Sequence, residues 1–110
     1  MTKDDVLNQF ATDFSDPGSE TSGEYLQEHV LRRAERIAGE NREGLVAAMR
    51  DWLQRRSAPH TLLAVAVAQQ TGLTELVPDL QTLRGEIQDG RTMHAHEGTL
   101  VDRALETLQP

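Results

Sequence analysis

Cysteine is absent from the 110 residues of this chain. Its absence excludes disulfide bonds, thiolate metal sites and a cysteine nucleophile, and it is compatible with a reducing compartment. Long apolar runs are missing too, since the longest weakly polar stretch, residues 61–68, is far shorter than the roughly 20 residues of a membrane span. The acidic N-terminal residues lack the apolar segment of a secretory signal. We therefore expect a soluble, cytoplasmic protein.

Basic residues are scarce, because 11 Lys and Arg stand against 18 Asp and Glu, which gives a net charge of −7. This balance argues against general nucleic-acid binding, which depends on neutralising phosphates with Lys and Arg. The charge is also uneven: residues 1–24 carry −5, residues 25–58 carry +2 and residues 59–110 carry −4. The Arg-bearing middle of the chain therefore lies between two acidic segments.

Arg32, Arg33 and Arg36 are clustered in this basic middle. Ion pairs with Glu28 and Glu35 along one helix are the structural interpretation of the cluster. A docking site for an acidic partner is the functional alternative, because arginine favours bidentate contact with carboxylate or phosphate.

Apolar residues recur at helical spacing along nearly the whole chain. Strand patterns are absent, because β-branched and aromatic residues never alternate over a useful length. We expect an acidic, mobile loop at residues 15–23, and residues 91–97 fit either a loop or a helix. The sequence predicts an all-α fold of five to six helices, over residues 3–14, 24–38, 41–56, 57–71, 74–89 and 100–108.

Helix ends are marked by glycine and by capping residues. Gly39, Gly72 and Gly90 are expected to stop the helices that precede them. Asn41 and Thr74 are expected to cap the helices that follow. Ser57 is a further expected cap, and Pro59 and Pro78 fit the first turns of their helices, where a missing N–H costs little. The helix around residues 61–68 is the least polar and should be the most buried, and Trp52 should lie in the core.

The sequence also contains an internal repeat, which appears when it is shifted by 31 residues. Both copies then read as a helix, a tight polar turn and a second helix that opens with paired aliphatic residues. The register holds over about two dozen positions. Among the matched pairs are Leu45 with Leu76, Val46 with Val77, Met49 with Leu80 and Trp52 with Leu83.

Residues 66–80 resemble a HEAT-type repeat, in which an Ala-rich helix is followed by a short turn and by a second helix opening with aliphatic-Pro-x-Leu. Val77, Pro78 and Leu80 match that opening, whereas the earlier copy has Ala47 in place of the proline. The Asp and Arg ladder common in such repeats is not clear. The resemblance covers residues 25–110 and implies antiparallel helix pairs stacked into a right-handed α-solenoid fragment. An irregular helical bundle remains the alternative.

This resemblance divides the chain into an N-terminal amphipathic helix with the mobile acidic loop, residues 1–23, and a helical repeat domain, residues 24–110. A single helix pair cannot bury its own apolar stripe, so neighbouring pairs stack into a continuous core. The terminal helices, or a second subunit, must then cover the ends of so short a stack. A homodimer is therefore left open.

His94, His96 and Glu97 form the cluster with most metal-ligand character in the sequence. No second cluster accompanies them and the H-E-x-x-H spacing of zinc proteases is absent, so His94 and His96 are weak candidates for a metal site. Serine elbows, phosphate-binding loops and carboxylate pairs suited to acid–base chemistry are absent as well. We therefore expect no enzyme activity and no cofactor, with a metal-assisted hydrolase as a minor alternative.

In HEAT-like stacks the second helix of each unit usually lines the concave surface. The resemblance therefore implies a partner-binding strip, and the function we expect is a non-catalytic protein–protein interaction module that binds neither nucleic acid nor membrane. An immunity or antitoxin protein that neutralises a basic toxin such as a nuclease is the alternative, because the acidic charge would steer such an association. The residues of the strip are Arg50, Asp51, Gln54, Gln81 and Thr82.

Overall fold

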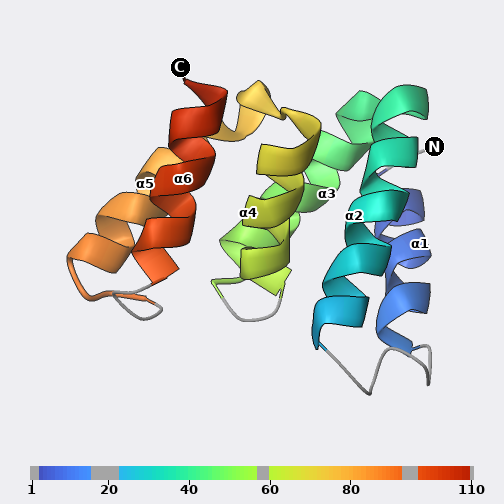
Figure 1. The fold of residues 1–110 in the computed structure, drawn as a ribbon, viewed down its shortest axis with the longest axis horizontal. Coiled ribbons are helices and arrows are strands. Elements are labelled where there is room, and N and C mark those ends of the chain that lie inside the picture. Colours follow the sequence, from blue (N-terminus) through green and yellow to red (C-terminus); the bar gives the residue numbers. More distant parts are fainter. Residues whose placement is uncertain (1–2, 16–22, 57–59, 93–96, 110) are drawn as a thin grey trace. The chain divides into compact units, whose positions relative to one another are not determined.

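The computed structural model describes residues 3–15, 23–56, 60–92 and 97–109, and the regular structure of these residues is helical throughout (Figure 1). The predicted all-α fold of five to six helices is thereby confirmed. None of the described helices combines the length and the apolar character that crossing a membrane requires. The elements are α1 (Lys3–Ser15), α2 (Gly23–Glu40), α3 (Arg42–Gln54), α4 (His60–Thr71), the 3-10 helix η2 (Thr74–Leu76), α5 (Val77–Gln88) and α6 (Gly98–Leu108).

The chain forms two compact units, Met1–Ala48 and Met49–Pro110. The boundary falls within α3, so the first turns of this helix belong to the first unit and its last turns to the second. Most of the predicted loop at residues 15–23, the predicted cap Ser57 with Pro59, and residues 93–96 of the ambiguous segment lie outside the described residues.

In the first unit α1 packs against α2. The side chains that recur every three or four residues along these helices form the buried stripe of each, as expected for amphipathic helices. Where α2 passes into α3, Leu45 and Ala48 are buried as well. Among the residues of α1 and α2 whose burial the structure describes, 3–11 and 27–40, the buried ones are Val6, Phe10, Val30, Ala34 and Ile37.

A single residue, Asn41, joins α2 to α3. Its side-chain Oδ1 accepts a hydrogen bond of 3.2 Å from the backbone N–H of Gly44, so the predicted N-cap is confirmed. The predicted stop at Gly39 is wrong, because α2 continues through Gly39 to Glu40. The backbone of Asn41 still donates to the carbonyl of Ile37, and the chain turns at Asn41 without needing a left-handed glycine.

Gly44 is a buried position at the start of α3. A Cβ added there would lie 3.2 Å from Cγ2 of Val6 on α1 and 3.0 Å from Cγ of Asn41. Both distances are shorter than comfortable carbon–carbon contacts, which lie at about 3.5–4.0 Å. Glycine therefore lets α1 and the capping side chain approach α3 closely.

The second unit begins with the last turns of α3. The prediction that this helix reaches Arg56 is wrong, because it ends at Gln54 and Arg56 takes a left-handed conformation with a φ of 53°. The backbone N–H of Arg56 donates to the carbonyl of Leu53 at 3.3 Å, which closes the helix end. Trp52 is 3% exposed, so its predicted place in the core is confirmed.

The predicted burial of α4 is confirmed, because buried residues occur on nearly every side of this helix. The hydroxyl of Thr61, also fully buried, donates to the carbonyl of Trp52 at 2.8 Å, which satisfies a polar group that would otherwise be costly to bury. The buried residues of α4 are Thr61, Leu63, Ala64, Val65, Val67 and Ala68.

Two of the three predicted glycine stops are confirmed. Gly72 and Gly90 have φ values of 67° and 75°, a conformation that costs glycine little. The residue after each glycine donates its N–H to a carbonyl of the last helical turn, as in a Schellman ending.

Thr74 does not cap α5 as predicted. It opens η2, and the residue before α5 is Leu76, which makes no side-chain cap hydrogen bond. The prediction for Pro78 is confirmed, because it lies in the first turn of α5.

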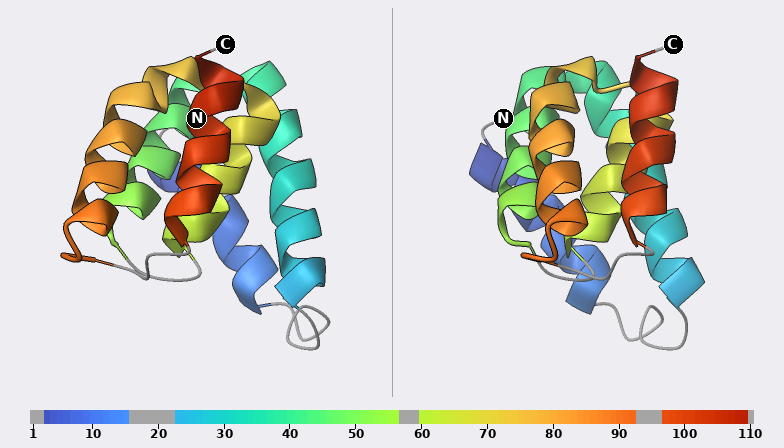
Figure 2. Two further views of the ribbon diagram at one scale, coloured as in Figure 1. Left: turned by 60° about the vertical axis from the view of Figure 1, so that its left-hand side comes forward. Right: turned by 90° about the vertical axis from the view of Figure 1, so that its left-hand side faces the viewer.

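In the second unit α4 and α6 run in one direction and α5 runs in the opposite direction (Figure 2). α6 packs against both α4 and α5. Gln69, late in α4, hydrogen-bonds Thr107, late in α6, so these two helices are parallel. By contrast, Gln81 contacts Gln109 and Arg84 contacts Asp102, so α5 runs antiparallel to α6.

Candidate interaction surface

Arg50, one of the predicted partner-binding residues, forms an ion pair with α5. Its Nε donates to Oδ2 of Asp79 at 3.1 Å, and its Nη2 donates to the carbonyl of Glu75 at 3.3 Å. The Arg50 side chain remains 41% exposed. It therefore joins α3 to the start of α5 while keeping part of its guanidinium accessible.

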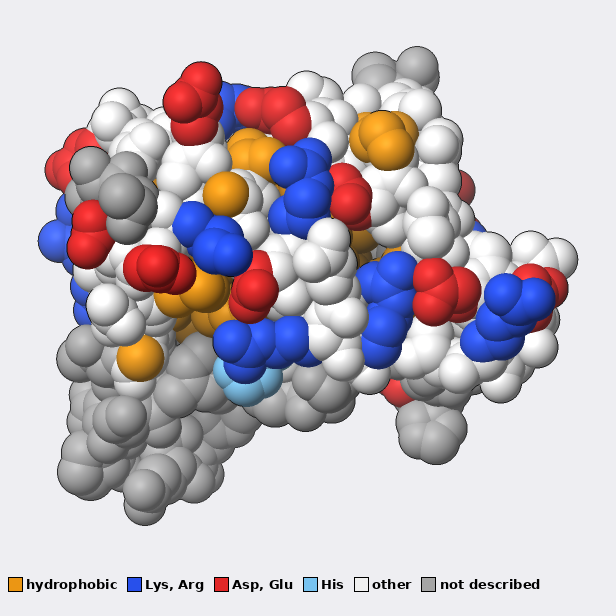
Figure 3. All heavy atoms as spheres, turned by 180° about the vertical axis from the view of Figure 1, so that it is seen from behind, with side chains coloured by type: hydrophobic (Ala, Val, Ile, Leu, Met, Phe, Trp, Pro, Cys, Tyr) orange, Lys and Arg blue, Asp and Glu red, His pale blue; other side chains and the backbone are white. Residues whose placement is uncertain are grey.

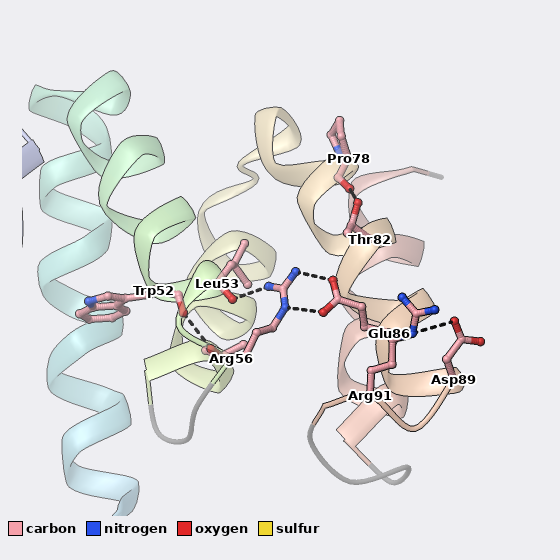
Figure 4. A network of polar contacts seen from close by, with 9 residues as sticks. Trp52, Leu53, Arg56, Pro78, Thr82, Glu86, Asp89 and Arg91 are labelled. Atoms are coloured by element: carbon pink, nitrogen blue, oxygen red, sulfur yellow. Dashed lines mark hydrogen bonds and ion pairs between the residues drawn. The ribbon is translucent and has the colours of Figure 1, made fainter.

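Arg56 makes the second connection between these helices (Figure 4). Its Nε and Nη2 donate to the two carboxylate oxygens of Glu86 at 3.2 and 2.9 Å, and its Nη1 donates to the carbonyl of Leu53. The hydrogen bond from Arg56 is the main reason why the pKa of Glu86 is lowered. Such a two-pronged contact fixes geometry better than a single hydrogen bond.

These two connections set the direction of α3 relative to α5. Arg50 pairs with Asp79 near the start of α5, and Arg56, which comes later in the chain, pairs with Glu86 near the end of α5. The end of α3 therefore runs parallel to α5. Thr82 lies between Asp79 and Glu86 in sequence, on the same side of α5, and its hydroxyl donates to the carbonyl of Pro78 at 3.1 Å (Figure 4).

The five predicted residues are therefore only partly brought together. Arg50, Asp51 and Gln54 share the outer side of α3, and Asp51 accepts a hydrogen bond of 3.3 Å from Arg55. Thr82 lies on the side of α5 that carries Asp79 and Glu86, the partners of Arg50 and Arg56. Gln81 instead reaches toward the end of α6, where its amide contacts Gln109 at 3.4 Å.

The charges on this surface largely neutralise one another. Arg50, Arg55 and Arg56 pair with Asp79, Asp51 and Glu86. On the neighbouring side of α5, Arg84 pairs with Asp102 at 2.7 Å. Figure 3 shows the same mixture on one face of the molecule, where basic and acidic side chains lie next to one another. The chain as a whole is acidic, but the α3–α5 surface carries few unpaired charges.

Sequence reasoning missed Arg56, Glu86, Arg84 and Asp102 as members of this surface. A signal was present, because the two α3–α5 ion pairs join residues 29 and 30 positions apart, close to the 31-residue shift of the internal repeat. A search for opposite charges about 31 positions apart would therefore have pointed to these pairs.

His60 lies at the start of α4, beside the end of α3. Its ring meets the ring of Trp52 edge to face, with 5.4 Å between the centroids. Burial lowers the pKa of His60, and the positive charge of Arg55 lowers it further, whereas Asp51 acts in the opposite direction. The neutral imidazole is therefore favoured at this position.

The predicted metal candidates His94 and His96 lie outside the described residues. Glu97, which follows them, is 7% exposed and stands before the first residue of α6. Within residues 3–15, 23–56, 60–92 and 97–109, no group of three or more potential ligands lies close enough to hold a metal ion.

Comparisons with protein-family models, with curated proteins and with solved structures find no match for this chain.

Proposed function

We propose that this chain is a non-catalytic protein–protein interaction module of the cytoplasm, which binds its partner through the outer sides of α3 and α5. The observation that carries the proposal is the parallel alignment of the end of α3 with α5 by two ion pairs, Arg50–Asp79 and Arg56–Glu86. This alignment sets Gln54 and Thr82, both exposed, on adjacent helices, where one partner can contact both.

The proposed architecture is a HEAT-like stack, and helix directions in the second unit support it. α4 is parallel to α6, the end of α3 is parallel to α5, and α5 is antiparallel to α6. Alternating directions of this kind are expected when successive helix pairs stack on one another. In such stacks the same helix of each pair faces the partner, which favours α3 and α5 here.

Charge pairing predicts how binding should respond to salt. Because the arginines of the α3–α5 surface are already paired with carboxylates, a partner gains little from long-range attraction to them. We expect binding through this surface to weaken only slightly when salt is raised.

The test is capture of partners from native host lysate by the tagged protein, at low and high salt, with identification by mass spectrometry. The test variant is Gln54→Ala/Thr82→Ala, which removes exposed side chains and leaves the ion pairs in place. The control variant is Gln27→Ala/Thr99→Ala, which truncates exposed residues on α2 and α6. We expect one stoichiometric protein with the wild type and the control, and a clear loss with the test variant. Equal recovery by both variants would remove the α3–α5 surface from the proposal.

The second candidate, an immunity protein against a basic toxin, is favoured by the net charge of −7. Acidic charge speeds association with a basic nuclease and makes it strongly dependent on ionic strength. The same capture experiment separates the two candidates. A basic nuclease that is released at high salt supports the immunity function, whereas a partner retained at high salt supports the module proposed first.

A further inference from the structure

A basic stripe lies on α2, in the first unit. His29, Arg32 and Arg36 are all exposed. Because a helix turns by about 100° per residue, these three side chains project within about 60° of one another. The stripe spans two turns, or about 10 Å along the helix. Exposed Glu28 and Glu40 lie one turn before Arg32 and one turn after Arg36, so the stripe is a short basic segment between acidic residues.

The fold makes little use of the two arginines. Arg32 pairs with Glu28 of its own helix, and the two side chains are 73% and 55% exposed, an arrangement of small value to stability. The side chain of Arg36 makes no hydrogen bond or ion pair within the described part of the chain. The like charges of Arg32 and Arg36, one turn apart, destabilise the helix by about 0.2–0.5 kcal/mol, and the Glu28–Arg32 pair offsets a similar amount.

The arginines of the second unit present a contrast. Arg50, Arg56 and Arg84 each connect two helices through a carboxylate. Those three arginines have a structural reason to be present, and Arg32 and Arg36 have none of comparable weight. Arg32 and Arg36 therefore keep most of their hydrogen-bonding groups available to a second molecule.

We infer that the His29–Arg32–Arg36 stripe docks an acidic α-helix of another protein. Carboxylates at i and i+4 on the partner helix would have the same one-turn spacing as Arg32 and Arg36, and each guanidinium can hold a carboxylate with two hydrogen bonds. This surface and this partner chemistry are independent of the α3–α5 surface proposed above.

A protein helix fits the stripe better than nucleic acid. Glu28 and Glu35 lie along one edge of the stripe, where the closely spaced phosphates of a nucleic acid would be repelled. A helix can place carboxylates against Arg32 and Arg36 and leave neutral or basic side chains opposite the two glutamates. Because arginines and glutamates lie side by side here, the stripe favours a partner helix whose acidic side chains face the arginines only.

The test is fluorescence anisotropy with a labelled, alanine-based helical peptide of about 20 residues, long enough to be helical in water, that carries glutamates at i and i+4. A matched peptide with glutamine in their place and a single-stranded DNA are the comparison probes. Arg32→Glu/Arg36→Glu is the test variant. Arg91→Glu/Arg103→Glu is the control, because it changes the net charge equally at exposed positions outside the stripe.

We expect the glutamate peptide to bind the wild type, and its affinity to fall about tenfold in the test variant while staying within about threefold in the control. Arg32→Gln/Arg36→Gln, which adds no new repulsion along α2, should lose binding as well. The inference is overturned if the glutamate and glutamine peptides bind alike, if both charge variants weaken binding equally, or if DNA binds more tightly than the peptide. Self-association of the wild type that Arg32→Glu/Arg36→Glu abolishes would identify a second copy as the occupant, and would overturn it too.

Discussion

Arg56 holds both carboxylate oxygens of Glu86 while its own backbone is left-handed, with a φ of 53°. A left-handed conformation costs a residue other than glycine about 1–2 kcal/mol. The ion pair and the hydrogen bond to the carbonyl of Leu53 act against this cost. One residue therefore ends α3 and attaches it to α5.

Replacing Arg56 by alanine removes the ion pair and keeps the backbone strain, so Arg56→Ala should be less stable than the wild type. Arg56→Gly also removes the side chain, but it relieves the strain. We expect Arg56→Gly to be more stable than Arg56→Ala by about 1 kcal/mol, measured by urea denaturation. Equal stability of the two variants would show that the left-handed conformation carries no cost here.

The end of α3 also shows a limit of sequence-based prediction. Helix ends at Gly72 and Gly90 were predictable, because glycine adopts positive φ at little cost. Arg56 carries no such local signal, and Glu86, the residue that its side chain holds, lies 30 positions away in the sequence. Gly39 shows the converse, because a glycine near a helix end does not stop the helix when the next turn is capped by Asn41.

Gly85 is an exposed glycine within α5, and a Cβ added there would meet no atom within 4 Å. Its φ is not positive, so alanine fits the backbone. We expect Gly85→Ala to stabilise the protein by about 0.5–1 kcal/mol, because glycine is a poor helix former. The measurement is thermal or urea unfolding followed by circular dichroism.

Gly72 provides the matched control for this prediction. It also has open space around its Cβ position, but its φ is 67°, so Gly72→Ala should destabilise the protein by about 1 kcal/mol. If Gly85→Ala and Gly72→Ala both destabilise the protein, the sign of φ does not decide the effect of alanine at these positions.

Gly85 also lies on the outer side of α5. A Gly85→Ala variant that is more stable but no longer binds its partner would support the α3–α5 surface.

Gly44 should respond to alanine in the opposite way from Gly85, although both lie within helices. A Cβ at Gly44 would press on Val6 and on the side chain of Asn41, which caps α3. We expect Gly44→Ala to lose about 1–3 kcal/mol, the range typical of overpacking. The combination with Val6→Ala, which opens space, should cost less than the sum of the single changes, and strict additivity would argue against the contact.

The candidate surface was predictable in part. Periodicity identifies which residues of α3 and α5 face outward, and Gln54 and Thr82 are exposed as expected. It does not separate Gln81 from Thr82, which are neighbours in sequence but differ by about 100° around the helix. Helical periodicity by itself also gives no register between α3 and α5, so the pairing of Arg50 with Asp79 has to be sought through the 31-residue repeat instead.

His60 provides a prediction about pH. Its pKa is lowered in the folded protein, first by burial and then by the charge of Arg55, whereas in the unfolded chain it returns to about 6.5. Between the lowered value and about 6.5, the unfolded chain binds a proton that the folded protein does not. Stability should therefore fall as the pH decreases below about 6.5, and this loss should end once the folded imidazole is itself protonated.

The variant that checks this is His60→Gln, which keeps a polar side chain but cannot be protonated. Urea unfolding between about pH 7.5 and 5, above the range in which free carboxylates titrate, should show a smaller decrease in stability for His60→Gln than for the wild type. His29→Gln, at an exposed position of α2, is the control for the exchange of a histidine for glutamine. If His60→Gln retains the full decrease, the pH dependence arises elsewhere, and burial beside Trp52 has no measurable effect on the imidazole.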